Sequence, residues 1–186
     1  MERHQLTQHI FTISDVLSST ECQQLIELSE AQGFDAATIN AWDGPRLDRE
    51  ARNNDRVIVD DFTLAEKVWN RVRAFVPKIL RGRQVLGLNE RFRFYRYAAG
   101  QKFSWHADAP FQRGDKELSL LTFMIYLNDA YEGGATRFES LVVEGRRGMA
   151  LIFEHGLIHE GGEVSKGLKY VLRSDVMYGQ IGVLAG

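Results

Sequence analysis

The stretch RFRFYRY, residues 91–97, is the first of five short runs that determine the predicted fold. Each run is rich in aromatic and β-branched residues, which favour strands, and Gly, Asn, Asp or charged turns separate the runs. No long helical pattern lies between them, so the sequence predicts an antiparallel sandwich or jelly roll rather than alternating βαβ units. The other four runs are LSLLTFMIYLN (118–128), TRFESLVV (136–143), GMALIFE (148–154) and KYVLRSDVMY (169–178).

Two helices are predicted upstream of these strands, and we expect both to pack on one outer face of the sheet. Each begins with a capping box, in which a Ser or Thr is followed three residues later by a Glu. Apolar residues then follow at helical spacing until a Gly or Pro ends the pattern. These boundary residues are Ser18, Glu21 and Gly33 in the first helix, and Thr63, Glu66 and Pro77 in the second.

The segment AWDGPRLDREARNNDR, residues 41–56, separates the helices and is polar and marked by Gly and Pro. We predict a mobile surface loop, and long polar loops near sites often act as lids. Its arginines are more commonly solvated surface charge. We expect a single domain over 1–186, in which 1–84 supplies the helices and the loop and 85–180 forms the jelly-roll core.

Composition limits the classes of function. The chain has 186 residues, 44% hydrophobic and 26% charged, as in ordinary soluble globular proteins. A net charge of −2 argues against bulk attraction to nucleic acid or an anionic membrane. One cysteine permits no internal disulfide, and no signal peptide or membrane span is recognisable, so a cytoplasmic protein is expected.

The stretch FSWHADAPF, residues 103–111, contains the first candidate metal ligands. His106 and Asp108 share a face if this segment is extended, because side chains alternate along a strand. HGLIHEGG offers His155 and His159 as candidates for a third ligand. Two histidines and one carboxylate form the facial triad of non-haem Fe(II) oxygenases, which leaves coordination positions open for a cosubstrate and O2. A bare His-x-Asp pair is a weak signal, so the surrounding motifs carry the argument.

RYAAGQKFSWHAD, MIYLNDAYEGGATRF and IHEGGEVSKGLKYVLR together resemble the 2-oxoglutarate- and Fe(II)-dependent oxygenases, specifically the prolyl-4-hydroxylase-like branch. The resemblance covers about residues 88–178. It implies a mainly β (α+β) chain with a double-stranded β-helix, a jelly roll, and the metal in one mouth. It also implies that His106, Asp108 and His159 bind the iron, because His159 has the basic Lys169 ten positions later. His155 is then expected behind the ligands or facing the substrate.

The resemblance also assigns residues to the cosubstrate. Lys169 matches the residue that pairs with the distal carboxylate of 2-oxoglutarate, which would be costly to bury without a fixed cation. Tyr97 matches a tyrosine that donates to the same carboxylate, and Thr136 and Tyr126 match further pocket positions. For these three, an ordinary core residue is the alternative.

Strand alternation extends this set. If Tyr97 and Lys169 point into the barrel, so do Arg93, Tyr95 and Arg173. Arg173 would orient the cosubstrate or an acidic or carbonyl-rich substrate, or form a structural salt bridge with Asp175, Asp108 or Glu160. Trp105 would wall the cleft or stack on the substrate, with core packing as the alternative.

The resemblance implies oxidative decarboxylation of 2-oxoglutarate to succinate and CO2, coupled to hydroxylation of a substrate C–H bond. A prolyl residue of a peptide or protein is the leading candidate, and small molecules are the other. Ascorbate is a candidate reductant, and a monomer or a homodimer is expected. Two alternatives remain open. One is an inactive jelly-roll sensor that binds 2-oxoglutarate or a peptide, and the other is a cupin-like metalloenzyme that uses no 2-oxo acid.

Overall fold

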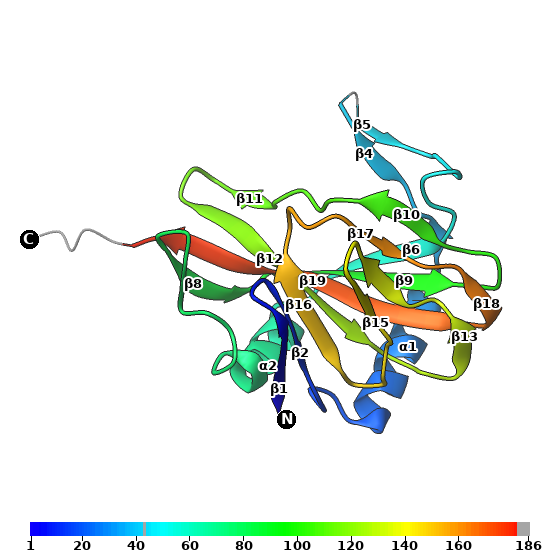
Figure 1. Ribbon diagram of the computed structural model, residues 1–186, viewed down its shortest axis with the longest axis horizontal. Helices are drawn as coiled ribbons and strands as arrows, with labels where there is room; N and C mark the ends of the chain where they lie inside the picture. The colour runs from blue at the N-terminus through cyan, green and yellow to red at the C-terminus, as the bar shows by residue number, and fades with distance from the viewer. Residues whose placement is uncertain (43, 182–186) are drawn as a thin grey trace, which may run out of the picture.

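The computed structural model of the chain describes residues 1–42 and 44–181, and it is mainly β, as predicted. A large antiparallel sheet forms the body of the molecule (Figure 1). Its strands follow the order β1 (Arg3–Thr7), β2 (Ile10–Ile13), β16 (Ala150–Glu154), β12 (Glu117–Tyr126), β19 (Lys169–Gln180), β9 (Arg91–Tyr97), β6 (Asp55–Asp60) and β3 (Asp35–Ala36). Three strands pair beside this path: β11 (Gln112–Arg113) with β12, and β7 (Ile79–Leu80) with β8 (Arg83–Leu88), which pairs with β19.

A smaller sheet faces the large one and completes the jelly roll. Apolar side chains from both sheets fill the space between them, including Tyr126 and Phe153 from the large sheet and Phe138 from the small sheet. The small sheet has the order β10 (Phe103–His106), β17 (His159–Gly161), β14 (Thr136–Phe138) and β15 (Leu141–Val143). Two further pairs are β13 (Tyr131–Gly133) with β18 (Val164–Gly167), and β4 (Ile39–Ala41) with β5 (Gly44–Arg46).

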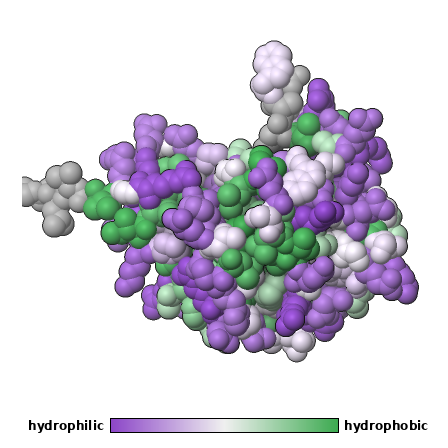
Figure 2. Space-filling view, viewed as in Figure 1, coloured by the Kyte–Doolittle hydropathy of each residue, from purple (hydrophilic) through white to green (hydrophobic). Residues whose placement is uncertain are grey.

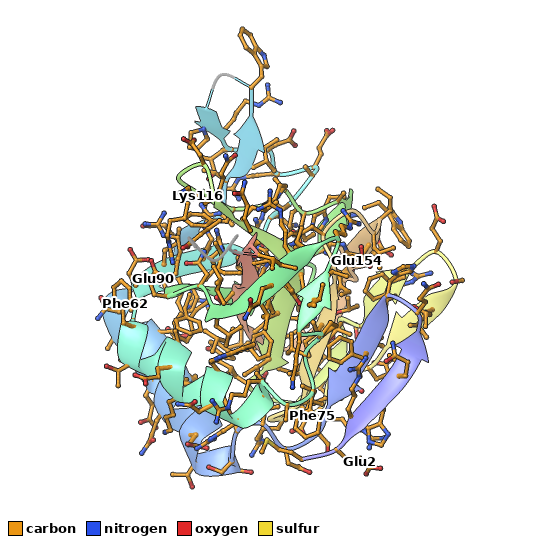
Figure 3. All side chains as sticks on the ribbon, turned by 90° about the vertical axis from the view of Figure 1, so that its left-hand side faces the viewer. Glu2, Phe62, Phe75, Glu90, Lys116 and Glu154 are labelled. Atoms are coloured by element: carbon orange, nitrogen blue, oxygen red, sulfur yellow. The ribbon has the colours of Figure 1, made fainter. Side chains whose placement is uncertain are left out.

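Both helices, α1 (Ser19–Gln32) and α2 (Phe62–Val72), pack on the other face of the large sheet, as predicted. Their buried Cys22 and Val68 belong to the same apolar cluster as Phe92 and Phe94 of β9. Figure 3 shows this helical layer from the side, with α2 running from Phe62 towards Phe75. Neither described helix is long and apolar enough to cross a membrane. Figure 2 shows hydrophilic side chains over most of the face viewed in Figure 1, with hydrophobic ones gathered near its middle.

Helix starts were predicted correctly once and incorrectly once. Ser18 caps α1, and the reciprocal bonds with Glu21 form the predicted capping box. The predicted box at Thr63 is wrong, because Asp61 caps α2 and its Oδ1 accepts a hydrogen bond from the Leu64 N–H. An aspartate two residues upstream provides the same acceptor, so the helix begins earlier.

The first half of the chain contributes more than helices and a loop. Strands β1, β2 and β6 belong to the large sheet, although no strand was predicted before residue 85. The segment 41–56 was predicted as a mobile surface loop, but parts of it form strands. Its first part forms the β4–β5 hairpin, which projects from the body in Figure 1, and its last residues enter β6. Between them, the Ala51 carbonyl accepts a hydrogen bond from the Ser104 N–H, which attaches the segment to β10.

Candidate active site

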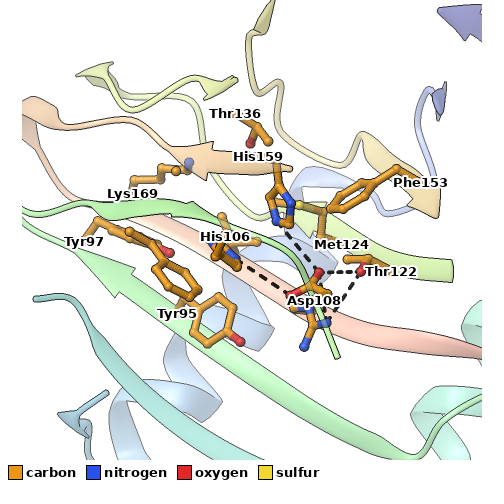
Figure 4. A pocket seen from close by; sticks show the side chains of 14 residues that line it. Tyr95, Tyr97, His106, Asp108, Thr122, Met124, Thr136, Phe153, His159 and Lys169 are labelled. Atoms are coloured by element: carbon orange, nitrogen blue, oxygen red, sulfur yellow. Dashed lines mark hydrogen bonds and ion pairs between the residues drawn. The ribbon is translucent and has the colours of Figure 1, made fainter. Parts of the chain in front are cut away.

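The small sheet and the loop that follows β10 bring His106, Asp108 and His159 together at one end of the barrel (Figure 4). His106 ends β10 and His159 begins β17, and the antiparallel register places these two residues directly opposite each other. Asp108 follows β10 by two residues, and its N–H donates to the His155 carbonyl. One ligand atom from each of the three side chains lies within 4.8 Å of the other two.

Backbone carbonyls orient both histidine rings. His106 Nδ1 lies 2.7 Å from the Ser104 carbonyl oxygen, and His159 Nδ1 lies 2.9 Å from the Leu157 carbonyl oxygen. A carbonyl only accepts, so each Nδ1 carries the proton and each Nε2 keeps a free lone pair. Both Nε2 atoms lie 3.8 Å from the Asp108 carboxylate, so the lone pairs and the carboxylate converge on one point.

Electrostatics keep the three groups in the protonation states that a cation requires. Burial, followed by the neighbouring His159, lowers the pKa of His106 to about 4, and burial also lowers the pKa of His159. Burial alone would raise the pKa of Asp108, but Arg173 and His159 outweigh it and hold that pKa below its usual value. At neutral pH the site therefore presents two neutral imidazoles and one carboxylate.

This donor set fits Fe(II). Imidazole nitrogens and a carboxylate oxygen are donors that suit Fe(II), and His106, Asp108 and His159 would be the residues that hold it. Only three protein ligands are brought together here, so a bound Fe(II) would keep coordination positions for small molecules. The same three side chains line a pocket, so small molecules would reach these positions.

A hydrogen-bond relay fixes the Asp108 carboxylate from behind. Thr122 Oγ1 donates to Asp108 Oδ2 at 2.5 Å and therefore accepts from His155 Nδ1 at 2.8 Å. His155 Nε2 then accepts from the Ser119 hydroxyl at 2.7 Å. His155 is thus buried behind the triad and does not face the pocket, which corrects its assignment to the substrate. Alternation from Tyr126 along β12 would have identified Thr122, because both lie on the same face.

An inner chamber extends from the triad to Lys169, the first residue of β19. Its Nζ donates to the Gly134 carbonyl at 2.5 Å, and the Tyr97, Tyr126 and Tyr131 rings surround it. No carboxylate lies within 4.0 Å of this Nζ among the described residues. Burial lowers the pKa of Lys169 to about 8, which shows that the charged ammonium is unfavourable here. An anion bound beside it would stabilise the charged form. The distal carboxylate of a bound 2-oxo diacid would be such an anion.

The other predicted cosubstrate residues lie at different depths. Tyr97 lines the chamber opposite Lys169 in the register, and burial raises its pKa, so the phenol remains a hydrogen-bond donor. Thr136 also lines the chamber. Tyr126 does not line it; its hydroxyl lies behind Thr136, 2.7 Å from the Thr136 hydroxyl. The structure thus places Tyr126 as a support for Thr136 rather than as a pocket residue.

Arg173 forms ion pairs with two of the carboxylates predicted for it. Its Nη2 lies 3.1 Å from Asp108 Oδ2 and 3.2 Å from Asp175 Oδ1. Arg93 binds the other oxygen of Asp175 at 3.1 Å. Arg173, Arg93, Tyr95 and Trp105 all line a second, outer chamber, and Trp105 is 47% exposed there rather than packed in the core.

Sequence comparison agrees with this geometry. Residues 92–174, which include all three candidate ligands and Lys169, match the model of the 2OG-Fe(II) oxygenase superfamily. This match covers the region of the chain that holds the whole candidate site. The site is that of a 2-oxoglutarate-dependent oxygenase, and the family and the triad together imply Fe(II) and 2-oxoglutarate. No curated protein sequence matches the oxygenase.

Solved structures share the fold of this oxygenase over most of its length. A viral collagen prolyl hydroxylase from Paramecium bursaria Chlorella virus-1, in complex with 2OG, is 21% identical, with a TM-score of 0.67 over 91% of this chain and 96% of that chain. A Pseudomonas putida prolyl-4-hydroxylase is 18% identical, with a TM-score of 0.64 over 94% and 95%. A Trichoplax adhaerens prolyl hydroxylase, in complex with a hypoxia inducible factor peptide fragment, is 17% identical, with a TM-score of 0.69 over 91% and 84%.

Proposed function

We propose that this oxygenase hydroxylates a C–H bond of a peptide or protein, with a prolyl residue as the leading candidate. The observation that carries the proposal is that one pocket holds both an open triad and a buried lysine, beside which the described residues place no carboxylate. The structural neighbours named as prolyl hydroxylases, one of them in complex with a peptide, support the choice of a peptide. The outer chamber, with a volume of about 380 Å³, has room for a side chain and its neighbours.

The residues have separate tasks in this proposal. His106, Asp108 and His159 hold Fe(II), and Lys169, Tyr97 and Thr136 bind the distal carboxylate of 2-oxoglutarate, where charge-assisted hydrogen bonds are strongest. The bound Fe(II), with 2-oxoglutarate and O2, supplies the oxidising power that inserts one oxygen atom into the substrate as the cosubstrate becomes succinate and CO2. The carboxylate at position 108 favours hydroxylation over halogenation, because it fills the position that a halide would need. No side chain has to act as a general base.

Anaerobic titration of the protein with Fe(II) and 2-oxoglutarate is the deciding experiment. We expect a weak visible charge-transfer band that requires both additions and is absent in a His159→Gln variant. A protein that binds Fe(II) but no 2-oxoglutarate would instead be a cupin-like metalloenzyme, which would overturn the proposal. A protein that shows the band but forms no succinate in air would be a sensor. Proline-containing peptides are then screened in air for the mass increase of one oxygen atom.

A further inference from the structure

The outer chamber is unusually rich in arginine. Four guanidinium groups line it beside His106 and Asp108, and we call it the arginine chamber. Phe103, Tyr95 and Trp105 provide its apolar and aromatic surface. Four cations around one chamber repel one another unless anions separate them, so their partners decide what the chamber can bind. The four residues are Arg52, Arg56, Arg93 and Arg173.

The strand register explains why three of these arginines face inwards. Arg56 of β6 lies opposite Tyr95 of β9, and Arg93 lies opposite Arg173 of β19. These residues share a face with Tyr97 and Lys169, because side chains alternate along each strand. Val57 and Val59, the alternate residues of β6, pack against the helical cluster on the opposite face. The inward direction of Arg56 is therefore a property of the sheet.

Arg52 reaches the chamber from the segment that precedes β6. It is 4% exposed, and its guanidinium carbon lies 4.1 Å from the Phe103 ring centroid and 5.0 Å from that of Tyr95. The Phe103 ring in turn stacks on His106 at 3.5 Å. Arg52 was expected to be solvated, and its burial beside the triad corrects that expectation.

The carboxylates of the site neutralise only two of the four arginines. Arg173 pairs with Asp108 and Asp175, and Arg93 pairs with Asp175. Within residues 1–42 and 44–181, no carboxylate lies within 4.0 Å of Arg52 or Arg56. Their hydrogen-bond acceptors are neutral: the Asn54 amide oxygen for Arg52 and the Thr38 hydroxyl for Arg56.

Fe(II) and 2-oxoglutarate do not supply the missing negative charge. The metal carries two positive charges and the cosubstrate two negative charges, so together they add none. Moreover, Lys169 in the inner chamber already offers a cation for the distal carboxylate. Burial lowers the pKa of the Arg56 guanidinium, and the positive charges of the other three arginines lower it further, which agrees with an uncompensated positive chamber.

We propose that the arginine chamber binds a carboxylate group of the substrate, close to the carbon that is hydroxylated. This inference rests on the proposed function and adds a substrate class to it. A planar guanidinium presents paired N–H donors that match a carboxylate, and Arg52 Nη1 and Arg56 Nη1 have no acceptor among the described residues. In a peptide the carboxylate is an Asp or Glu side chain next to the reacting residue. In a small molecule it is the free acid of the reacting residue itself.

The test measures binding to the complete Fe(II)- and 2-oxoglutarate-loaded chain without O2, by calorimetry. The probes are acetyl-Ala-Glu-Pro-Ala-amide, acetyl-Ala-Pro-Glu-Ala-amide and their glutamine counterparts, with N-acetylproline and its amide as the small-molecule pair. We expect at least one carboxylate probe to bind about tenfold or more tightly than its neutral partner, because hydrogen bonds between charged groups are stronger than those between neutral groups. The pair that shows the preference identifies the source of the carboxylate.

Variants then assign the preference to the chamber. Arg56→Gln removes one unpaired charge, and we expect it to reduce the preference for the carboxylate about tenfold, whereas Arg56→Lys retains part of it. Arg146→Gln is the matched control, because Arg146 is exposed and lies outside the arginine chamber. The melting temperature of each variant shows whether it folds. Arg52 is left unchanged, because its contacts with Phe103 also support the fold.

Each result separates this inference from the proposed function. An absent charge-transfer band in the unmutated protein rejects the oxygenase site before any peptide is added. A normal band, with no carboxylate probe bound more tightly than its neutral partner, rejects the inference alone. So does a preference that Arg56→Gln leaves unchanged. A phosphoserine peptide that binds while the glutamate and glutamine peptides behave alike would reject a carboxylate in favour of phosphate.

Discussion

Lys169 shows how function at a single residue opposes stability. Its buried ammonium contacts a backbone carbonyl and three tyrosine rings, and the described residues place no carboxylate beside it. A buried cation without a counter-ion destabilises the free protein, and a bound dicarboxylate removes that penalty. The same feature that makes the free state unfavourable therefore contributes to cosubstrate affinity.

The Lys169→Met variant should therefore be more stable than the unmutated protein but bind 2-oxoglutarate less tightly. The folded pKa of Lys169, about 8, lies below the ordinary 10.5, so the unfolded chain binds more protons between these values and stability rises with pH in that window. We expect Lys169→Met to raise the stability of the free protein by about 1–4 kcal/mol at pH 7 and to lose 2-oxoglutarate affinity about 100-fold or more. The stability gain should shrink as the pH approaches 10. Urea unfolding and calorimetry of both proteins from pH 7 to 10 measure this, and a gain independent of pH would contradict it.

Residues also show where prediction from sequence succeeds and where it stops. The candidate ligands and Lys169 were selected because each stands in a motif of fixed local spacing, and the structure brings them to one pocket. Alternation then placed Arg93 and Arg173 on the same face of the sheet. Arg52 was not recognisable, because a polar segment becomes buried only when Ala51 bonds to Ser104, fifty-three residues away. The prediction that Thr63 caps the second helix was wrong for a local reason, because Asp61 caps it instead.

At the scale of elements, strand order places the chemistry. The first ligand ends β10 and the third begins β17, so one register places both histidines without help from a flexible loop. Asp108 is different, because it lies beyond β10 and needs support from other elements. The relay of Ser119, His155 and Thr122 supplies this support by connecting β12 and the end of β16 to the Asp108 carboxylate.

Thr122→Val tests this support with little change in side-chain shape. The variant removes the hydroxyl that donates to Asp108 and leaves His155 Nδ1 without its acceptor. Groups that orient metal ligands typically contribute 10–100-fold to metal affinity, so we expect a loss of about that size. Competition with a chelator, using Fe(II) without O2, measures the affinity. Thr122→Ser keeps the hydroxyl and should bind the metal nearly as the unmutated protein does; equal weakening of both variants would point to packing instead.

At the scale of the whole molecule, the site joins layers that are otherwise held together mainly by apolar contacts. Lys169 and Arg173 belong to the large sheet, whereas His106 and His159 belong to the small sheet. The helices lie on the opposite face of the large sheet, and no residue of either helix lines the inner or the outer chamber. Ligands at this site should therefore stabilise the two sheets against separation, and the effect of 2-oxoglutarate should depend on whether the metal is bound.

We expect this dependence in the melting temperature. A ligand that binds only the folded state at about 100 times its Kd adds about 2.7 kcal/mol, which for a chain of this size raises Tm by roughly 5–10 °C. Mn(II), which does not turn over with O2, should raise Tm alone, and 2-oxoglutarate should raise it further only when the metal is present. A chelator should reverse both increases. If 2-oxoglutarate raised the Tm of the metal-free protein and of a His106→Gln variant as much as that of the metal-loaded protein, the cosubstrate would bind through Lys169 without the triad, and the coupling between the two sheets through the metal would be excluded.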